Sequence, residues 1–221
     1  MDKLIPDFQT SLFDGFSDIL VDYCDWGIDS VLQDSPLKDI PIVRTIVNAG
    51  KFAQNVRDRN LVRQTLVFIT EFNKGEVSSK KLEKYKEKLR NKPERLEEEL
   101  GRVLLLLDRN IDKIKTEFEA KLYVSYVNGQ ITWDMFCELC DITDRLFISD
   151  LSKLKEAYNN DGVTEQMPIS YMYDRLISVG LLTNEERLSD NFNGIDEDKD
   201  EQQYIIRVTE IGRKFCNIVF G

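Results

Sequence analysis

The chain contains no histidine among its 221 residues. This absence excludes Ser-His and Cys-His nucleophile pairs, general acid–base catalysis by histidine, and the common zinc and non-haem iron sites. Neither GxxxxGK(S/T) nor GxGxxG occurs, so the sequence shows no glycine-rich phosphate loop. Catalysis by carboxylates with magnesium, or by a lysine, is the chemistry left open. We expect a protein that is not an enzyme and that uses no cofactor.

Long apolar runs are also missing. No segment reaches the roughly 18 apolar residues that a membrane-spanning helix needs, and the first residues, MDKLIPDFQT, lack the pattern of a signal peptide. We expect a soluble, cytoplasmic protein.

Cysteine is scarce, and two of the four cysteines form the motif CELC at Cys137 and Cys140. Redox pairs of this spacing normally follow a strand and open a helix, whereas this pair lies inside a predicted helix. A zinc site would need all four cysteines, because histidine is absent. We interpret the thiols as buried core groups, with a metal or redox pair as the alternative.

Negative charge dominates, with a net charge of −10, and it is unevenly distributed. Residues 1–37 carry one lysine against eight aspartates. The pattern predicts an amphipathic helix over about 8–33. One side of that helix would carry an acidic stripe, which we call the Asp stripe: Asp14, Asp18, Asp22, Asp25 and Asp29.

A basic segment follows, and residues 38–74 carry seven basic groups against three acidic ones. Its candidate partner-binding residues are Arg44, Lys51, Arg57, Arg59 and Arg63. The favoured interpretation places this segment beside the Asp stripe, within one chain or between subunits. The alternative is an anion site for phosphate, nucleic acid or a lipid head group. A membrane-perturbing effector would need residues 42–72 to leave the core.

The middle of the chain reads as successive helices with clear start and stop signals. Ser78 and Thr132 are predicted N-caps, and Asn128-Gly129 is a predicted helix end. The helices are expected at about 80–90, 93–108, 111–127, 133–147 and 149–159. The run 103-VLLLL-107 is expected to be buried. Short connections favour antiparallel packing, so residues 1–160 are predicted to form a helical bundle domain.

The pattern changes after NNDG at 159–162, where a domain boundary is expected. A helix within 168–183, a polar wing at 184–203, a strand at 204–209 and a helix at 210–220 follow in order. This is the order of a winged-helix tail. The predicted fold class is therefore mainly α, a helical bundle followed by a small winged-helix-like α+β domain at 161–221.

The charges of this tail disfavour DNA. Its predicted recognition helix, ISYMYDRLIS, has Arg175 as its sole base. The wing contains Asp196, Asp198 and Asp200, which phosphates would repel, so we expect these residues to bind a protein partner. A calcium loop aligned on Gly194 is a weaker interpretation, because Ser189 stands where the first aspartate is needed.

Three stretches carry a resemblance. LKDIPIVRTIVNAGKFAQNVRDRNLVRQ (37–64) and VNGQIT (127–132) resemble uncharacterised helical proteins of bacterial genomes and mobile elements. YIIRVTEIGRKF (204–215) is similar to the winged-helix tail of the abortive-infection alpha family of phage-defence proteins. The resemblance implies a role in phage defence and carries over no catalytic residue.

We therefore expect a non-enzymatic interaction or regulatory protein whose partner is another protein or a second copy of itself. The main alternative is a nucleic-acid-binding regulator that uses the basic segment and the winged helix. The third hypothesis is a membrane-perturbing effector.

Overall fold

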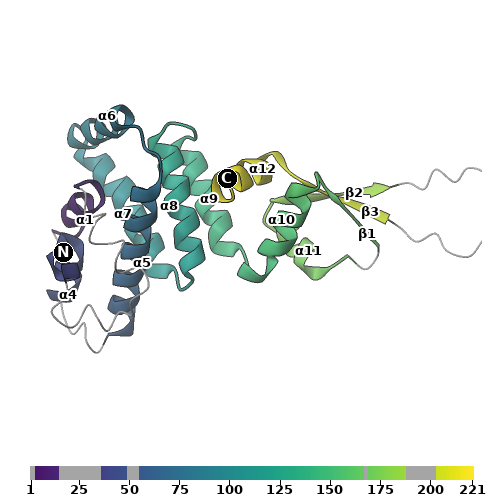
Figure 1. Cartoon of the computed structure of the whole chain (residues 1–221), viewed down its shortest axis with the longest axis horizontal. Helices are drawn as coiled ribbons and strands as arrows, with labels where there is room; N and C mark the ends of the chain where they lie inside the picture. The colour runs from purple at the N-terminus through teal and green to yellow at the C-terminus, as the bar shows by residue number, and fades with distance from the viewer. Residues whose placement is uncertain (1–2, 15–35, 49–54, 167–168, 188–202) are drawn as a thin grey trace, which may run out of the picture. The chain divides into compact units, whose positions relative to one another are not determined.

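The computed structural model describes residues 3–14, 36–48, 55–166, 169–187 and 203–221. The chain divides into two compact units, Met1–Phe136 and Cys137–Gly221. Within the described residues it forms ten α-helices and one small three-stranded antiparallel sheet near the C-terminus (Figure 1). This confirms the predicted fold class.

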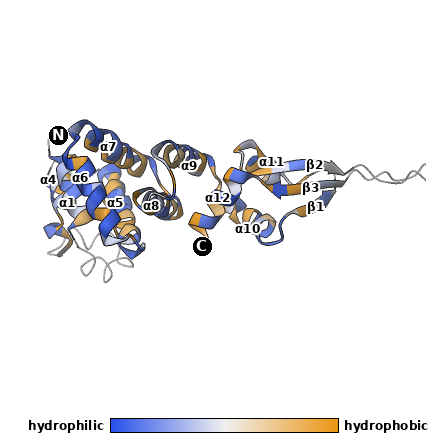
Figure 2. Cartoon of the chain, turned by 90° about the horizontal axis from the view of Figure 1, so that it is seen from above, coloured by the Kyte–Doolittle hydropathy of each residue, from blue (hydrophilic) through white to orange (hydrophobic). Residues whose placement is uncertain are grey.

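The first unit is a helical bundle. Its longer helices α5, α7 and α8 pack side by side, and α6 packs against α7 and α8 (Figure 1). Both hydrophilic and hydrophobic residues occur along these helices (Figure 2), as amphipathic packing requires. The helices are α1 (Leu4–Phe13), α4 (Pro41–Asn48), α5 (Val56–Lys74), α6 (Ser79–Arg90), α7 (Pro93–Arg109), α8 (Lys113–Val127) and the start of α9 (Trp133–Arg145), with a 3-10 turn at Pro36–Asp39 before α4.

Local signals set several helix ends. Ser78 accepts a hydrogen bond from the backbone N–H of Lys81, and Thr132 accepts one from Met135, so both predicted N-caps are confirmed. Asn55 caps α5 by accepting from the N–H of Arg57. Gly129 has φ +68°, the left-handed conformation that ends many helices, as its position predicted.

Aromatic rings fill the core of this bundle. The rings of Phe8 and Phe68 lie 6.2 Å apart, those of Phe68 and Tyr123 5.7 Å, and those of Tyr123 and Phe136 5.5 Å. All four side chains are fully buried. Ring contacts of this kind add specific geometry to the burial of apolar area, so α1, α5, α8 and α9 are held in one arrangement.

The N-terminal part of the unit differs from the predicted long helix. α1 begins at Leu4 and ends at Phe13, and the rest of the predicted 8–33 helix lies outside the described residues. α1 packs on α4, where the Ser11 hydroxyl accepts a hydrogen bond of 3.0 Å from the N–H of Ile42. The Thr45 hydroxyl donates to the carboxylate of Asp7.

The expectation that 103-VLLLL-107 is buried is wrong at one residue. Val103, Leu104, Leu106 and Leu107 are buried, but Leu105 is 66% exposed. Five consecutive residues go more than once around a helix of 3.6 residues per turn. Since one side of α7 faces outward, one member of such a run must face outward too. Val56, the first residue of α5, is likewise 78% exposed.

The second unit combines short helices with the sheet. Its strands pair antiparallel in the order β1-β3-β2, with Val163 opposite Ile206 and Leu182 opposite Val208. The predicted strand and closing helix are confirmed, but β1 was not predicted and β2 occupies the start of the predicted wing. The elements are a 3-10 turn at Ile148–Asp150, α10 (Leu151–Asn159), β1 (Val163–Gln166), α11 (Tyr171–Ser178), β2 (Leu182–Arg187), β3 (Gln203–Val208) and α12 (Glu210–Val219).

The helix α10 packs with other elements of the second unit. It contacts β3, α11 and α12. The compact second unit therefore begins at Cys137, ahead of the predicted domain boundary at residue 160. The division into independent domains at 160 stays a prediction.

A close approach fixes the start of α12. The Thr209 hydroxyl caps the helix by accepting from the N–H of Gly212 at 2.9 Å, and it donates to the carbonyl of Gly180. A Cβ atom built on Gly212 would lie 2.0 Å from the carbonyl oxygen of Leu181. Only glycine fits there, so the glycine in the sequence TEIGRKF (209–215) has a geometric cause.

Candidate functional site

The residues predicted to bind a partner are divided among several elements, and part of the set lies outside the described residues. Arg44 is exposed on α4, whereas Arg57, Arg59 and Arg63 belong to α5. At about 100° per residue, Arg59 and Arg63 share one side of α5 and Arg57 lies on the other. Lys51 lies outside the described residues, as do three wing aspartates: Asp196, Asp198 and Asp200.

Arg57 has an ion-pair partner inside its own unit. Its Nε donates to the two carboxylate oxygens of Asp108 at 2.8 and 3.1 Å, and a terminal nitrogen donates to the same group. This contact, with a charge-assisted hydrogen bond as the main cause, raises the pKa of Arg57. Asp108 belongs to α7 and not to the Asp stripe. The predicted pairing of the basic segment with that stripe stays a prediction.

Arg175 of α11 is also committed to a carboxylate. Its Nε donates to Asp150 at 2.9 Å, and Asp150 is only 1% exposed. The guanidinium carbon lies 4.2 Å from the ring centre of Phe147 and 4.8 Å from that of Tyr171. The sole base of the predicted recognition helix is therefore held by its own unit.

Three of the four cysteines lie in the described part of the chain. Cys140 and Cys216 are fully buried, and Cys137 is half-buried. Burial raises the pKa of the Cys216 thiol to about 12, which suits an unreactive core group. Within the described ranges, no group of three or more Cys, Asp or Glu side chains has the arrangement of a metal site.

None of the helices in the described part of the chain has both the length and the apolar character that a bilayer crossing requires.

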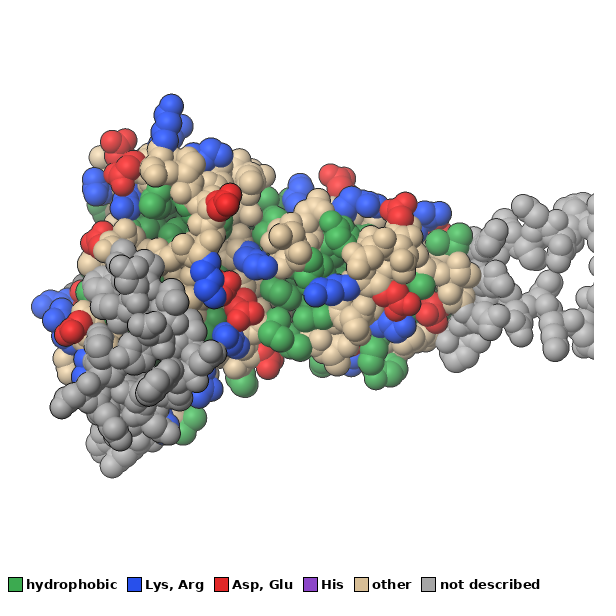
Figure 3. Space-filling view, in the orientation of Figure 1, with side chains coloured by type: hydrophobic (Ala, Val, Ile, Leu, Met, Phe, Trp, Pro, Cys, Tyr) green, Lys and Arg blue, Asp and Glu red, His purple; other side chains and the backbone are tan. Residues whose placement is uncertain are grey.

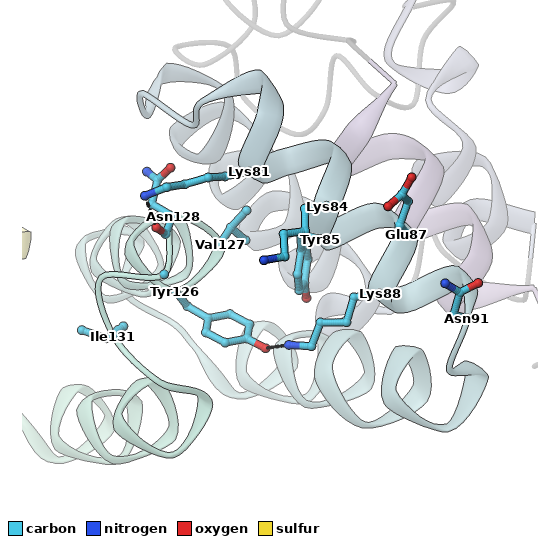
Figure 4. Close-up of a pocket in the computed structure, with 11 residues that line it drawn as sticks. Lys81, Lys84, Tyr85, Glu87, Lys88, Asn91, Tyr126, Val127, Asn128 and Ile131 are labelled. Carbon is cyan, nitrogen blue, oxygen red and sulfur yellow. Dashed lines mark hydrogen bonds between the residues drawn. The ribbon is translucent and has the colours of Figure 1, made fainter.

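A basic cleft lies between α6 and the end of α8, with a volume of about 630 Å³. We call it the lysine cleft, after Lys81, Lys84 and Lys88 of α6. These residues are spaced three and four apart, so they project from one side of the helix. In Figure 4 the amino groups of Lys84 and Lys88 lie between α6 and Tyr126, and the carboxylate of Glu87 points away from them.

Each lysine has a different environment. Lys81 donates to the backbone carbonyl of Asn128, and Lys88 donates to the Tyr126 hydroxyl at 3.1 Å, the dashed line of Figure 4. Lys84 is exposed, and no described residue forms a hydrogen bond or ion pair with it. Lys84 is therefore the cation most available to a ligand.

The base of the cleft is a buried hydrogen-bond network around Glu99, which is 0% exposed. Tyr85 donates to Glu99 Oε2 at 2.5 Å, and Tyr126 donates to Oε1 at 2.7 Å. Arg95 Nε donates to Oε1 at 2.5 Å, and the Lys88 amine lies 3.8 Å from the same oxygen. The charge of Glu99 is thus satisfied within the protein, and Tyr85 also shares a 2.7 Å contact with the hydroxyl of Tyr123.

Burial decides the protonation of these groups. It raises the pKa of Tyr85, Tyr123 and Tyr126, so the phenols stay neutral donors. Burial also lowers the pKa of Lys88, against the opposing attraction of Glu99. Lys88 lies 5.8 and 5.4 Å from the ring centres of Tyr85 and Tyr126, a cation–π arrangement.

This arrangement suits the binding of an anionic group. The mouth of the cleft offers ammonium donors, and its base offers the aromatic surfaces of Tyr85 and Tyr126, whose hydroxyl groups already donate to Glu99. Ammonium groups bind carboxylate or phosphate oxygens by charge-assisted hydrogen bonds.

The sequence interpretation missed this site. It predicted helices over about 80–90 and 93–108 and assigned no binding role to either. The available signal was the spacing of the three lysines together with Tyr85, the one aromatic residue of the segment 80–90.

Comparisons with known proteins add no relative. No protein-family model, curated protein or solved structure matches this chain.

Proposed function

We propose that this chain is a non-enzymatic protein-interaction protein, and that its lysine cleft binds an acidic segment of a partner protein. The observation that carries the proposal is the convergence of Lys81, Lys84 and Lys88 on one cleft. An acidic peptide presents carboxylates at the spacing of its side chains, so it can meet two or three of these amines together. The aromatic rings at the base can contact the aliphatic parts of the same peptide.

The charges elsewhere favour a protein over a nucleic acid. The net charge of −10 repels a polyphosphate, whose non-specific binding depends on many lysine and arginine contacts. Arg57 and Arg175 are paired with Asp108 and Asp150. On the face drawn in Figure 3, acidic and basic side chains are interspersed rather than gathered into one basic band.

Phage defence is the biological setting of this proposal. It rests on the similarity of residues 204–215 to the winged-helix tail of the abortive-infection alpha family. A defence role fits an interaction protein that responds to the presence of a partner.

A binding assay with defined probes tests the proposal. A fluorescent ten-residue peptide of aspartate, glutamate and glycine is titrated with the full chain, and anisotropy is followed from low to high salt. We expect binding that weakens with salt. The double variant Lys81→Glu, Lys84→Glu should weaken it at least about tenfold, since it reverses two of the three charges.

The matched control is Lys80→Glu, Arg90→Glu. Both side chains are exposed on α6 and neither lines the cleft, so this variant makes the same change in net charge. Equal losses in the two variants would show attraction to total charge alone and would contradict the proposal. Tighter binding of a labelled 20-base-pair DNA duplex than of the peptide, lost in the cleft variant, would also contradict the proposal.

A further inference from the structure

A second depression lies on the same unit and has the opposite character. It has a volume of about 960 Å³ and is formed by α1, α5, α7 and the start of α9. Its apolar lining consists of Leu4, Ile5, Leu61, Leu104, Leu105 and Trp133. We call it the leucine groove.

The exposure of Leu105 marks this groove as unusual. Its side chain is 66% exposed within a run whose four other members are buried. A single exposed leucine is ordinary on a protein surface, but an exposed leucine inside an apolar groove is the arrangement of a binding site. Gly101 also lines the groove and carries no side chain.

The rim of the groove carries an excess of acid. Asp58, Glu97 and Glu98 line it, and Arg102 is the one lining base besides the paired Arg57. Arg57 and Asp108 neutralise each other. A partner with basic side chains beside its apolar ones therefore matches the rim, whereas a phosphate-bearing partner is repelled.

The length of the groove indicates the form of that partner. Its α7 lining runs from Glu97 to Asp108, which at 1.5 Å per residue is about 16 Å, or three helical turns. Leu104 and Leu105 lie within this span and three acidic residues lie at its ends, with Arg102 between them. We propose that the leucine groove binds a basic amphipathic helix of about three turns from a partner protein, by the helix-in-groove mode.

A designed peptide tests this without knowledge of the natural partner. The probe is a labelled three-turn peptide with leucines at i, i+3, i+4 and i+7 and lysines elsewhere, and a scrambled peptide of equal composition is its control. We expect the patterned peptide to bind the full chain at least about tenfold more tightly than the scrambled one. Hydrogen exchange should show new protection within 97–108.

Single substitutions place the binding site. Leu105→Asp should weaken binding at least about tenfold, and its exposed position lets the variant fold. Ile111→Asp is the matched control, because Ile111 is 82% exposed on the same unit and does not line the groove. Ile111→Asp should leave the affinity unchanged.

Three results would overturn the proposal. Peptide binding that survives Leu105→Asp would place the site elsewhere. Dimers of the chain alone that Leu105→Asp dissociates, seen by light scattering, would show that a second copy occupies the groove. Tighter peptide binding after replacement of residues 15–35 by a glycine-serine linker would show that this chain covers the groove itself.

Discussion

Both units bury a carboxylate beside an arginine, but they satisfy it in different ways. In the first unit, Glu99 accepts hydrogen bonds from three helices, through Tyr85 of α6, Arg95 of α7 and Tyr126 of α8. In the second unit, Asp150 depends mainly on Arg175, a contact between the Ile148–Asp150 turn and α11. The buried carboxylate of the first unit is therefore stabilised by several donors, and that of the second mainly by one ion pair.

The difference teaches where each unit is vulnerable. The first unit is most sensitive to removal of Glu99, because both tyrosines share that acceptor. The second unit is most sensitive to removal of Arg175, because loss of this half-exposed arginine leaves the buried charge of Asp150 without its partner. Four measurements test this comparison, from the largest expected effect to the smallest.

Glu99→Ala should have the largest effect. Two buried phenols lose their shared acceptor, and each such loss costs about 1–3 kcal/mol, so we expect a loss of about 4 kcal/mol in the free energy of unfolding. Urea unfolding followed by tryptophan fluorescence measures it, because Trp133 lies in the first unit and the sequence of the second unit contains no tryptophan. Glu98→Ala, an exposed neighbour, should change it by less than about 0.5 kcal/mol. Equal effects of the two would contradict the network.

Arg175→Ala should destabilise the second unit by about 3 kcal/mol. Removing one partner of a buried pair costs about 3–5 kcal/mol, and the arginine side chain here is 33% exposed, which favours the lower end. Far-UV circular dichroism combined with tryptophan fluorescence separates the two units during urea unfolding. Arg213→Ala is the control, because its pair with Asp161 is exposed and contributes less than about 1 kcal/mol. A loss no greater than the control's would show that Asp150 does not depend on Arg175.

Tyr126→Phe and Tyr173→Phe compare one hydroxyl in each unit. Tyr126 donates to fully buried Glu99, so its loss should cost about 1.5 kcal/mol. Tyr173 donates at 3.2 Å to Glu156, whose side chain is 40% exposed, so its loss should cost a few tenths of a kcal/mol. The same unfolding measurements apply. A larger loss of unfolding free energy for Tyr173→Phe than for Tyr126→Phe would contradict this comparison of the two units.

As the pH is raised, the free energy of unfolding should begin to fall at a lower pH in the second unit than in the first. Burial raises the pKa of Cys216 from 9.0 to about 12 and that of Tyr173 from 10.0 to about 12. A raised folded pKa means that the unfolded chain loses its proton first, so stability falls above the ordinary value. Between pH 8 and pH 9.5 the free energy of unfolding of the second unit should fall by about 1 kcal/mol, mainly through the Cys216 thiol, since 1.4 kcal/mol corresponds to one pKa unit. That of the first unit should fall by about half as much, because its buried groups with a raised pKa are tyrosines, whose ordinary pKa is 10.0.

Cys216→Ala is the control for this onset. It removes the thiol and should shift the onset of destabilisation in the second unit toward that of the tyrosines. An onset that the variant leaves at the same pH would contradict the assignment of this effect to the buried thiol.

Local patterns predicted much of the fold. Ser78, Thr132 and Gly129 mark helix ends by chemistry that acts within a few residues, and the structure confirms all three. The strand β3 alternates apolar and polar residues, so it was predicted as well. β2, with the sequence LTNEER, lacks that alternation and forms because it pairs with β3.

The lysine cleft and the leucine groove could not be predicted in the same way, because both depend on packing between distant residues. Glu99 belongs to a run of three glutamates, and only contact with α6 and α8 makes one of them buried. Leu105 looks like its leucine neighbours in the sequence, and only the outward side of α7 distinguishes it. The lysines of α6 were visible, but their cleft exists only beside the end of α8.

The glycine at 212 has a consequence for how this tail is compared with other proteins. The carbonyl oxygen of Leu181 occupies the space of any larger side chain, so every chain that turns from a strand into a helix in this manner must place glycine there. Identity at this one position between two such tails therefore reports a shared steric demand, and evidence for common ancestry must come from residues that this corner does not constrain.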